Sequence, residues 1–374
     1  MQIERGDGLR TIAVLNQKGG VGKTTTVANT AAALTAVGLN VVVIDLDPQA
    51  HLTIHLGVEP QAVEVGSYEV LTQSADFEKS LMLVRHNLWL LGANINLVGA
   101  ETELVSVVGR EIILREAMAT GRDKFDYCLI DCAPSLGLLS LNALAAAEEV
   151  LIPLQPHFLA LQGFGKLLQT VDLVNKRINP GLKVTGVLLC MFDTRASLPS
   201  EVRADIERFL EAARGSDSAW AGAEVLPTFI RRNIKLAEAP SYGQTIFEYD
   251  PTCNGAQDYR KVARYMLGLD PEPEEPEAPA DSAAEPALEG EDQTGVAADS
   301  NTESEAQVDS SGGEITDSQQ NPSQEDRLQE PPIEIRSVDA PGPHRHDPDP
   351  AWTHPEPSPS DSSHDSDSNE HTTP

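Results

Sequence analysis

Glycines, lysines and threonines gather in one short stretch near the start of the chain, "NQKGGVGKTTTVAN" at residues 16–29. Gly22, Lys23 and Thr24 match the end of the phosphate-loop pattern G-x-x-x-x-G-K-[ST], although Gln17 stands where that pattern begins with glycine. Backbone N–H groups of such a loop point at phosphate oxygens, the lysine adds positive charge, and the hydroxyl binds Mg²⁺. The stretch therefore predicts a nucleotide site with Mg²⁺, the alternative being a structural glycine-rich turn.

The predicted nucleotide contacts extend over the whole loop and into the following helix. They are Lys18, Gly19, Gly20, Val21, Gly22, Lys23, Thr24 and Thr25. Thr25 is placed to reach the α phosphate. Lys18 is unusual, because a second lysine beside Lys23 suffers like-charge repulsion in an empty loop. Its presence makes best sense where several phosphate charges are bound.

Two aspartates end the apolar run "NVVVIDLD" at residues 40–47. Asp45 and Asp47 fall on one face of a strand, and Pro48 stops that strand, so a carboxylate can project toward the γ phosphate. Asp47, nearer the mouth, is our candidate for positioning or activating the attacking water. A turn or N-cap aspartate is the alternative interpretation.

A third aspartate ends another apolar run. Asp131 closes "DYCLIDCA" at residues 126–133, as expected of a strand-end acid that holds the Mg²⁺ shell together with Thr24. An aspartate that merely terminates the strand is the competing interpretation. The candidate metal ligands are therefore Thr24 and Asp131.

Short apolar runs alternate with helical patterns along residues 1–270. The predicted strands are 11–16, 40–47, 87–93, 126–133, 150–155 and 183–192, and the predicted helices are 22–38, 101–121, 137–147, 161–178 and 197–215. Runs that are apolar on both faces are typical of strands buried between two helix layers. The alternation predicts an α/β fold with a doubly wound, mostly parallel sheet, whose ligands bind at the carboxyl ends of the strands.

Together these motifs resemble the ParA/Soj family of partition ATPases and its deviant Walker A loop, within the group that includes MinD. The resemblance rests on "KGGVGKTT", "DLDPQ" and "DCAPSLGLLSLNAL" and covers about residues 10–267. It implies a slow, partner-stimulated ATPase. In that family the signature lysine, here Lys18, reaches across an ATP-sandwich homodimer to the partner's nucleotide, as an arginine finger does. Lys18, Lys23 and Asp47 are then the candidate catalytic residues.

The resemblance also implies partners. Family dimers bind DNA without sequence preference, and a ParB-like adaptor stimulates hydrolysis and releases them. The positions matching the family's basic surface are Arg195, Arg231, Arg232 and Lys235, although surface arginines and lysines are usually only solvated. Asn233 matches the adenine contact. Arg231 replaces a proline that many members carry, and we expect its charge to add to DNA binding.

Three rival functions come from other classes. A MinD-like positioning ATPase needs a basic amphipathic helix at the C-terminal end, whereas "AQDYRKVARYMLGLD" is followed by carboxylates. A nitrogenase reductase-like enzyme needs cluster-ligating cysteines, and only Cys132 falls near the phosphate end; a biotin-pathway ligase-like enzyme belongs to the same metabolic class. An adaptor that binds ATP without hydrolysing it is the third.

Charge divides the chain into two predicted parts. Of the net charge of −31 over 374 residues, −24 falls in residues 271–374, which hold 27 acidic and 3 basic side chains. This composition predicts a disordered acidic tail that competes with DNA for the basic surface or keeps the protein soluble. The remaining 1–270 form the predicted ATPase domain. With no signal-peptide or membrane-spanning pattern, we expect a cytoplasmic, nucleoid-associated protein that does not bind membranes.

Overall fold

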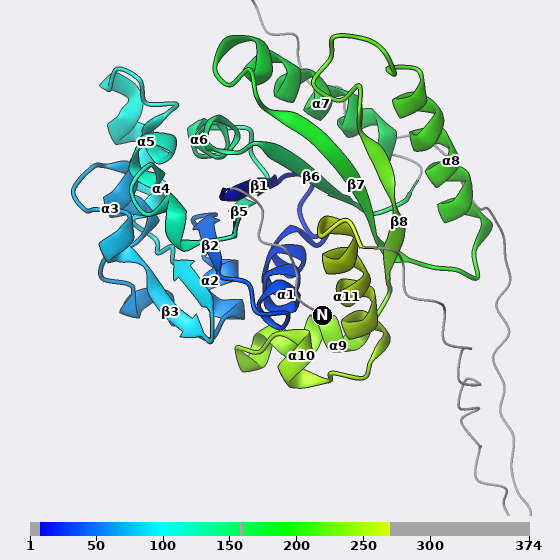
Figure 1. The fold of residues 1–374 in the computed structure, drawn as a ribbon, viewed down its shortest axis with the longest axis horizontal. Coiled ribbons are helices and arrows are strands. Elements are labelled where there is room, and N and C mark those ends of the chain that lie inside the picture. The colour runs from blue at the N-terminus through cyan, green and yellow to red at the C-terminus, as the bar shows by residue number, and fades with distance from the viewer. Residues whose placement is uncertain (1–7, 158–159, 270–374) are drawn as a thin grey trace, which may run out of the picture. The chain divides into compact units, whose positions relative to one another are not determined.

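The computed structural model describes residues 8–157 and 160–269, drawn in colour in Figure 1. The strands are β1 (Arg10–Val14), β2 (Val41–Leu46), β3 (Met82–Arg85), β4 (Leu88–Leu91), β5 (Tyr127–Cys132), β6 (Glu149–Leu154), β7 (Lys183–Phe192) and β8 (Glu224–Arg231). The α-helices are α1 (Lys23–Thr35), α2 (His51–His55), α3 (Ser67–Leu71), α4 (Leu97–Glu103), α5 (Ile113–Met118), α6 (Leu138–Ala146), α7 (Ala160–Arg177), α8 (Ser197–Glu211), α9 (Ile234–Glu238), α10 (Ile246–Tyr249) and α11 (Asn254–Met266). Single 3₁₀ turns lie at Pro60–Ala62, Glu78–Ser80, Leu104–Ser106, Arg122–Lys124 and Ala239–Tyr242.

The strands form one sheet in the order β3-β4-β2-β5-β1-β6-β7-β8. Every pairing is parallel except that of β3 with β4. The prediction of a doubly wound, mostly parallel α/β sheet is therefore confirmed. In the register of β2 and β5, Asp45 lies directly opposite Asp131. Two of the predicted strand-end acids thus lie side by side at the same edge.

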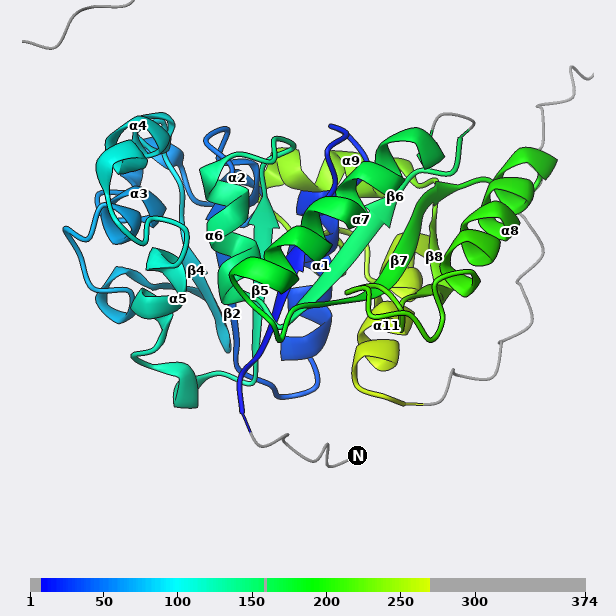
Figure 2. The same cartoon turned by 90° about the horizontal axis from the view of Figure 1, so that it is seen from above.

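Helices cover both faces of the sheet (Figures 1 and 2). A separate apolar core lies under each helix layer. One core packs α5, α6, α7 and α8 against side chains such as Val42 and Ile44. The other packs α1, α2 and α11 against the alternate side chains, such as Val41 and Val43. Burial on both faces explains why these strands read as continuous apolar runs.

Two strands and several helices differ from the sequence prediction. The strands β3 and β8 were missed, and so were the helices α2, α3, α9, α10 and α11. β8 carries Pro227, which removes a backbone donor and is tolerated here because β8 lies at the edge of the sheet. The predicted helix 101–121 is divided into α4, a 3₁₀ turn and α5. The chain leaves the helical conformation in between, where Gly109 has a φ of 74°.

The predictions made for the acidic tail 271–374 lie outside the described residues, and so does residue 270 at the boundary of the predicted domain. Among the residues that are described, no helix combines the length and apolarity that crossing a membrane requires.

Candidate phosphate and nucleotide site

The loop between β1 and α1 has the backbone that a phosphate cradle needs. Gly20 and Gly22 have φ values of 71° and 96°, which residues with a side chain rarely adopt. Gly22 ends the loop as the N-cap of α1, and its carbonyl accepts the Thr26 N–H at 2.9 Å. The N–H groups of the first helical turn thus remain at the mouth, where the positive end of the helix favours an anion.

Lys23, the first residue of α1, is buried at the base of this loop, with 7% of its surface exposed. Its ammonium donates to the Lys18 carbonyl at 3.2 Å, which holds the loop closed around it. Burial lowers the pKa of Lys23, and the nearby Asp131 carboxylate opposes that shift. A phosphate group bound at the loop supplies the negative charge that this desolvated cation lacks.

Thr24 and Asp131 meet as the sequence predicted. The Thr24 hydroxyl donates to Asp131 Oδ2 at 2.7 Å, and Asp131 Oδ1 is buried without a donor among the described residues. Burial, and then the neighbouring Asp45 charge, raise the pKa of Asp131 well above its usual range. An orphaned carboxylate oxygen beside a threonine hydroxyl fits a Mg²⁺ site, because Mg²⁺ typically takes one or two carboxylates together with substrate phosphates.

The two aspartates at the end of β2 have different environments. Asp45 is fully buried, and its Oδ2 accepts both the N–H (2.9 Å) and the hydroxyl (2.7 Å) of Thr53. Burial raises the Asp45 pKa to about 6. Asp47 lies beyond the strand with 9% exposed; one of its oxygens accepts the Gln49 N–H at 2.9 Å. Asp45 therefore anchors the turn, and Asp47 is the acid nearer the phosphate loop's mouth.

Asn233, the predicted adenine contact, begins α9 beyond β8. Its Oδ1 accepts the Lys235 N–H at 2.8 Å, which caps that helix. Residues 243–248, which follow α9, are fastened to α1 through Asn29, whose Oδ1 accepts the Ile246 N–H at 2.7 Å. The same side chain donates to the Thr25 carbonyl at 2.8 Å. Asn29 thus connects α1, the helix that follows the phosphate loop, to residues 243–248.

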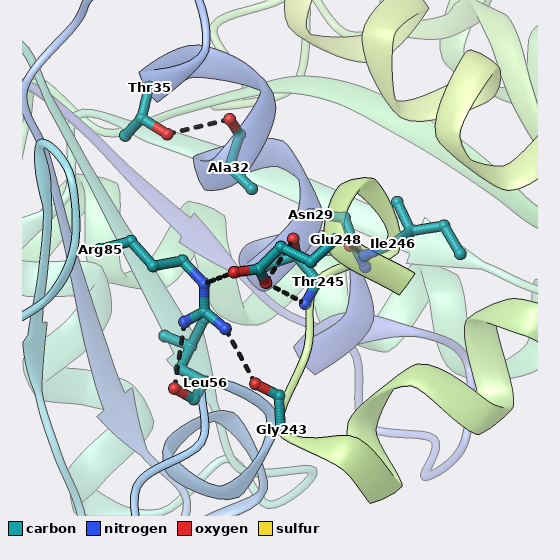
Figure 3. A network of polar contacts seen from close by, with 9 residues as sticks. All are labelled: Asn29, Ala32, Thr35, Leu56, Arg85, Gly243, Thr245, Ile246 and Glu248. Atoms are coloured by element: carbon teal, nitrogen blue, oxygen red, sulfur yellow. Dashed lines mark hydrogen bonds and ion pairs between the residues drawn. The ribbon is translucent and has the colours of Figure 1, made fainter. Parts of the chain in front are cut away.

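Arg85 of β3 completes this connection (Figure 3). Its guanidinium donates to Glu248 at 2.8 Å, to the Gly243 carbonyl at 2.8 Å and to the Leu56 carbonyl at 3.0 Å. Glu248 in turn accepts the Thr245 N–H at 2.8 Å, which caps α10. The network therefore links β3, the end of α2 and α10.

The four predicted DNA-contact residues have unequal environments. Arg195 and Arg232 are exposed beyond the carboxyl ends of the adjacent strands β7 and β8. Lys235 is half-buried and lies over the Tyr249 ring at 5.5 Å. Arg231 instead turns inward, where its Nη2 donates to the buried Asp258 carboxylate at 2.7 Å and its backbone N–H donates to the same side chain at 2.9 Å.

Sequence reasoning missed Asn29, Arg85 and Asp258, which hold the site together without contacting the phosphate position. Asn29 had a visible signal, since it is a polar residue within the otherwise apolar helix "VANTAAAL". Asp258 and Arg85 had none, because acids and arginines that form pairs within the fold look the same in a sequence as those that only face solvent.

All four cysteines of the chain are free thiols. Cys128, Cys132 and Cys190 are buried, and Cys253 is partly buried. Burial raises the Cys190 pKa to about 12. Cys132 is fully buried at the end of β5, and such a position is unsuited to a cluster shared between two chains.

Comparisons with known proteins show which family this chain is similar to. A family model described as an AAA domain matches residues 9–184. The chain is 41% identical to the sporulation initiation inhibitor protein Soj of Bacillus subtilis, covering 68% of this chain and 97% of that protein. It is also 41% identical to the chromosome-partitioning ATPase Soj of Treponema pallidum, covering 70% and 98%.

A solved structure of similar sequence points to the same ligands. It is named cobyrinic acid a,c-diamide synthase from Mycobacterium smegmatis and holds an ATP analogue and magnesium. It is 39% identical, covers 69% of this chain and 94% of its own, and superimposes with a TM-score of 0.59. With its relatives, its phosphate loop and its Thr24–Asp131 pair considered together, the chain belongs to the ParA/Soj family of partition ATPases, which use ATP and Mg²⁺.

Proposed function

We propose that ATP joins two copies of this partition ATPase into a dimer in which Lys18 of each copy contacts the nucleotide of the other. The dimer binds DNA without sequence preference and is therefore nucleoid-associated. A ParB-like adaptor bound to the cargo stimulates hydrolysis, and the separated copies leave the DNA.

The observation that carries this proposal is the contrast between the two lysines of the loop. Lys23 is buried and serves the phosphates of its own subunit, whereas Lys18 is exposed at the rim of the same loop. A cation on the rim of a phosphate site can serve a second subunit that approaches face to face. An arginine finger supplied in trans acts in the same way and accelerates phosphoryl transfer by about 10³- to 10⁵-fold.

The remaining roles follow from the environments of the side chains. Lys23 and the loop N–H groups bind the β and γ phosphates, Thr25 binds the α phosphate, and Asn233 contacts adenine. Thr24 and Asp131 would hold Mg²⁺, which neutralises phosphate charge when bound. Asp47 orients the attacking water and accepts its proton, since Asp45 is already occupied by Thr53.

For DNA contact, we propose the exposed Arg195 and Arg232 with the neighbouring Lys235. Each side chain that neutralises a phosphate releases counterions, and a dimer doubles the number of contacts. Arg231 contributes less than its charge suggests, because its guanidinium is bound to the buried Asp258.

Replacing Lys18 tests the proposal. For Lys18→Ala, we expect ATP-driven dimerisation, followed by light scattering coupled to gel filtration, and ATP-dependent DNA binding to disappear together. The matched control is Lys183→Ala, which removes an exposed lysine from the start of β7, at the end of that strand away from the phosphate loop. Dimerisation and DNA binding of Lys18→Ala at wild-type levels would overturn the proposal.

Two alternatives are separated by the ligand that activates the enzyme. A MinD-like positioning ATPase would co-sediment with anionic liposomes in ATP and ignore DNA. An enzyme with a role like that of the Mycobacterium smegmatis cobyrinic acid a,c-diamide synthase would turn over ATP in response to an acid substrate and not to DNA or an adaptor. We expect turnover to rise with DNA and adaptor together.

A further inference from the structure

Lys18 makes a contact on its own subunit that phosphate binding does not explain. Its ammonium lies within hydrogen-bonding distance of Nε2 of His157, 139 positions further along the chain. His157 follows the end of β6 and is half-buried, whereas Lys18 is exposed. The proposed trans-acting cation is therefore held in cis when no partner is present.

The backbone around this contact is fixed by the sheet. β1 and β6 are parallel neighbours, and the Leu15 N–H donates to the Leu151 carbonyl at 3.1 Å just beyond β1. Asn16 continues the attachment, because its Nδ2 donates to the Pro153 carbonyl at 2.7 Å and its Oδ1 accepts the Lys18 N–H at 3.0 Å. The strand ends thus bring Lys18 and His157 together.

A cavity of about 220 Å³ lies beside the pair, and its apolar wall includes Val21, Leu154 and Phe164. Such surroundings favour the uncharged form of an imidazole. Burial, and then the positive charge of Lys18, lower the pKa of His157. Neutral imidazole is the form that this contact requires, because an ammonium group has only donors and needs an acceptor.

The imidazole contacts the positive charge of the Lys18 ammonium. Along the chain, residues 150–156 of β6 and its extension carry no ionisable side chain, and the first one that follows His157 is Lys166 on α7. A protonated His157 therefore meets repulsion from Lys18.

We propose that His157 is a positioning residue that holds Lys18 on its own subunit and must release it before Lys18 can reach the nucleotide of a second copy. This latch rests on the function proposed above. Acidification opens it, since protonated His157 can no longer accept from Lys18. ATP-driven pairing is accordingly opposed by two latches, one in each copy.

The effect of the latch on dimerisation can be measured. A hydrogen bond from an exposed charged donor, like an exposed ion pair, contributes about threefold to an equilibrium. Because two latches open for each dimer formed, removing them should tighten the dimer about tenfold. The dissociation constant can be measured by analytical ultracentrifugation with Mg²⁺ and a non-hydrolysable ATP analogue, so that hydrolysis does not separate the copies.

Three variants divide the possible outcomes. His157→Ala should dimerise about tenfold more tightly than wild type near neutral pH. His157→Gln keeps an acceptor that cannot be protonated, so it should match wild type there. The wild-type dimer should become tighter than the His157→Gln dimer as the pH falls below about 6.5. His86→Ala, which removes an exposed histidine from the β3–β4 turn, is the control.

Failure of the latch differs from failure of the proposed function. A wild-type dissociation constant for His157→Ala, or parallel pH profiles for wild type and His157→Gln, would overturn the latch. If His157→Ala does not fold, the comparison with His157→Gln decides alone. Lys18→Ala in either background tests the function instead: if it still dimerises with the analogue, trans contact by Lys18 is wrong whatever His157 does.

Discussion

Two regions at the carboxyl ends of the strands place their charged side chains in opposite environments. They are the phosphate end, around the loop between β1 and α1, and the basic end, beyond β7 and β8. At the phosphate end, Lys23, Asp45 and Asp131 are buried close to one another, so burial perturbs their pKa values. At the basic end, Arg195 and Arg232 are exposed. The charged groups of the first region are buried together in a fixed arrangement, whereas those of the second face solvent.

Arg231 lies on the border of these two regions, and it shows that neighbours in sequence need not share a role. It is adjacent to Arg232, yet its guanidinium is bound to the buried Asp258. Some charged residues therefore act through a fixed internal partner, and others act through a charge that faces solvent. Substitutions in the two classes should change different observables.

The largest effect is expected for Asp47→Ala at the phosphate end. Removing a group that accepts a proton costs about 100-fold or more in turnover. Phosphate release with DNA and adaptor should fall by that amount, while ATP-driven dimerisation persists. Glu59→Ala, which removes an exposed acid beyond α2, serves as the control. Turnover close to wild type would exclude Asp47 as the water-orienting residue.

The next largest effect is expected for Arg231→Ala, which removes the side chain that lies between the two regions. It removes the guanidinium from the buried Asp258 carboxylate, which keeps the backbone N–H of position 231, at a cost of about 3 kcal/mol in unfolding free energy. Urea denaturation should reveal this decrease, whereas Arg232→Ala should change stability by less than about 0.5 kcal/mol. The double variant R231M/D258L should recover much of the stability, because it removes both charges. Equal decreases in unfolding free energy for Arg231→Ala and Arg232→Ala would show that the two arginines do not differ in their contribution to stability.

The pH dependence of stability extends the comparison to His55 at the end of α2. Burial, and then the Arg85 charge, lower its pKa to about 4. Unfolded histidine protonates first, near pH 6.5, so the contribution of His55 is complete above that pH and is lost as the pH falls toward 4.

Wild type should accordingly lose roughly 3 kcal/mol more than His55→Gln over this interval. The raised pKa of Asp45 acts in the opposite direction in both proteins. The difference between the two denaturation series is therefore the relevant measurement, and identical series would show that His55 titrates normally.

The smallest effect is expected for Arg195→Ala and Arg232→Ala at the basic end. Each should weaken DNA binding several-fold and reduce the slope of log affinity against log salt by about one for each phosphate that is no longer neutralised. Arg177→Ala is the matched control, since this exposed arginine ends α7 at the opposite edge of the sheet. An unchanged slope for both variants would place the DNA surface elsewhere.

Local features of the chain made the phosphate end predictable. The loop residues and the acids at 47 and 131 follow from a strand-turn-helix pattern that a short window contains. Long-range pairings were not predictable: Arg231 meets Asp258 from 27 positions away, and Lys18 meets His157 from 139. β8 was missed because Pro227 disguises an edge strand.

The hydrogen bond between Asn29 and Ile246 joins two parts of the chain that are synthesised far apart in time. It spans 217 positions, and Thr26 meets Tyr259 across 233. Non-local contacts form late, after the intervening chain has been synthesised and brought together. A growing polypeptide therefore exposes its phosphate loop long before Ile246 and Tyr259, which bind α1, leave the ribosome. We expect nascent chains to be unable to trap ATP, so that premature pairing of half-made copies is avoided.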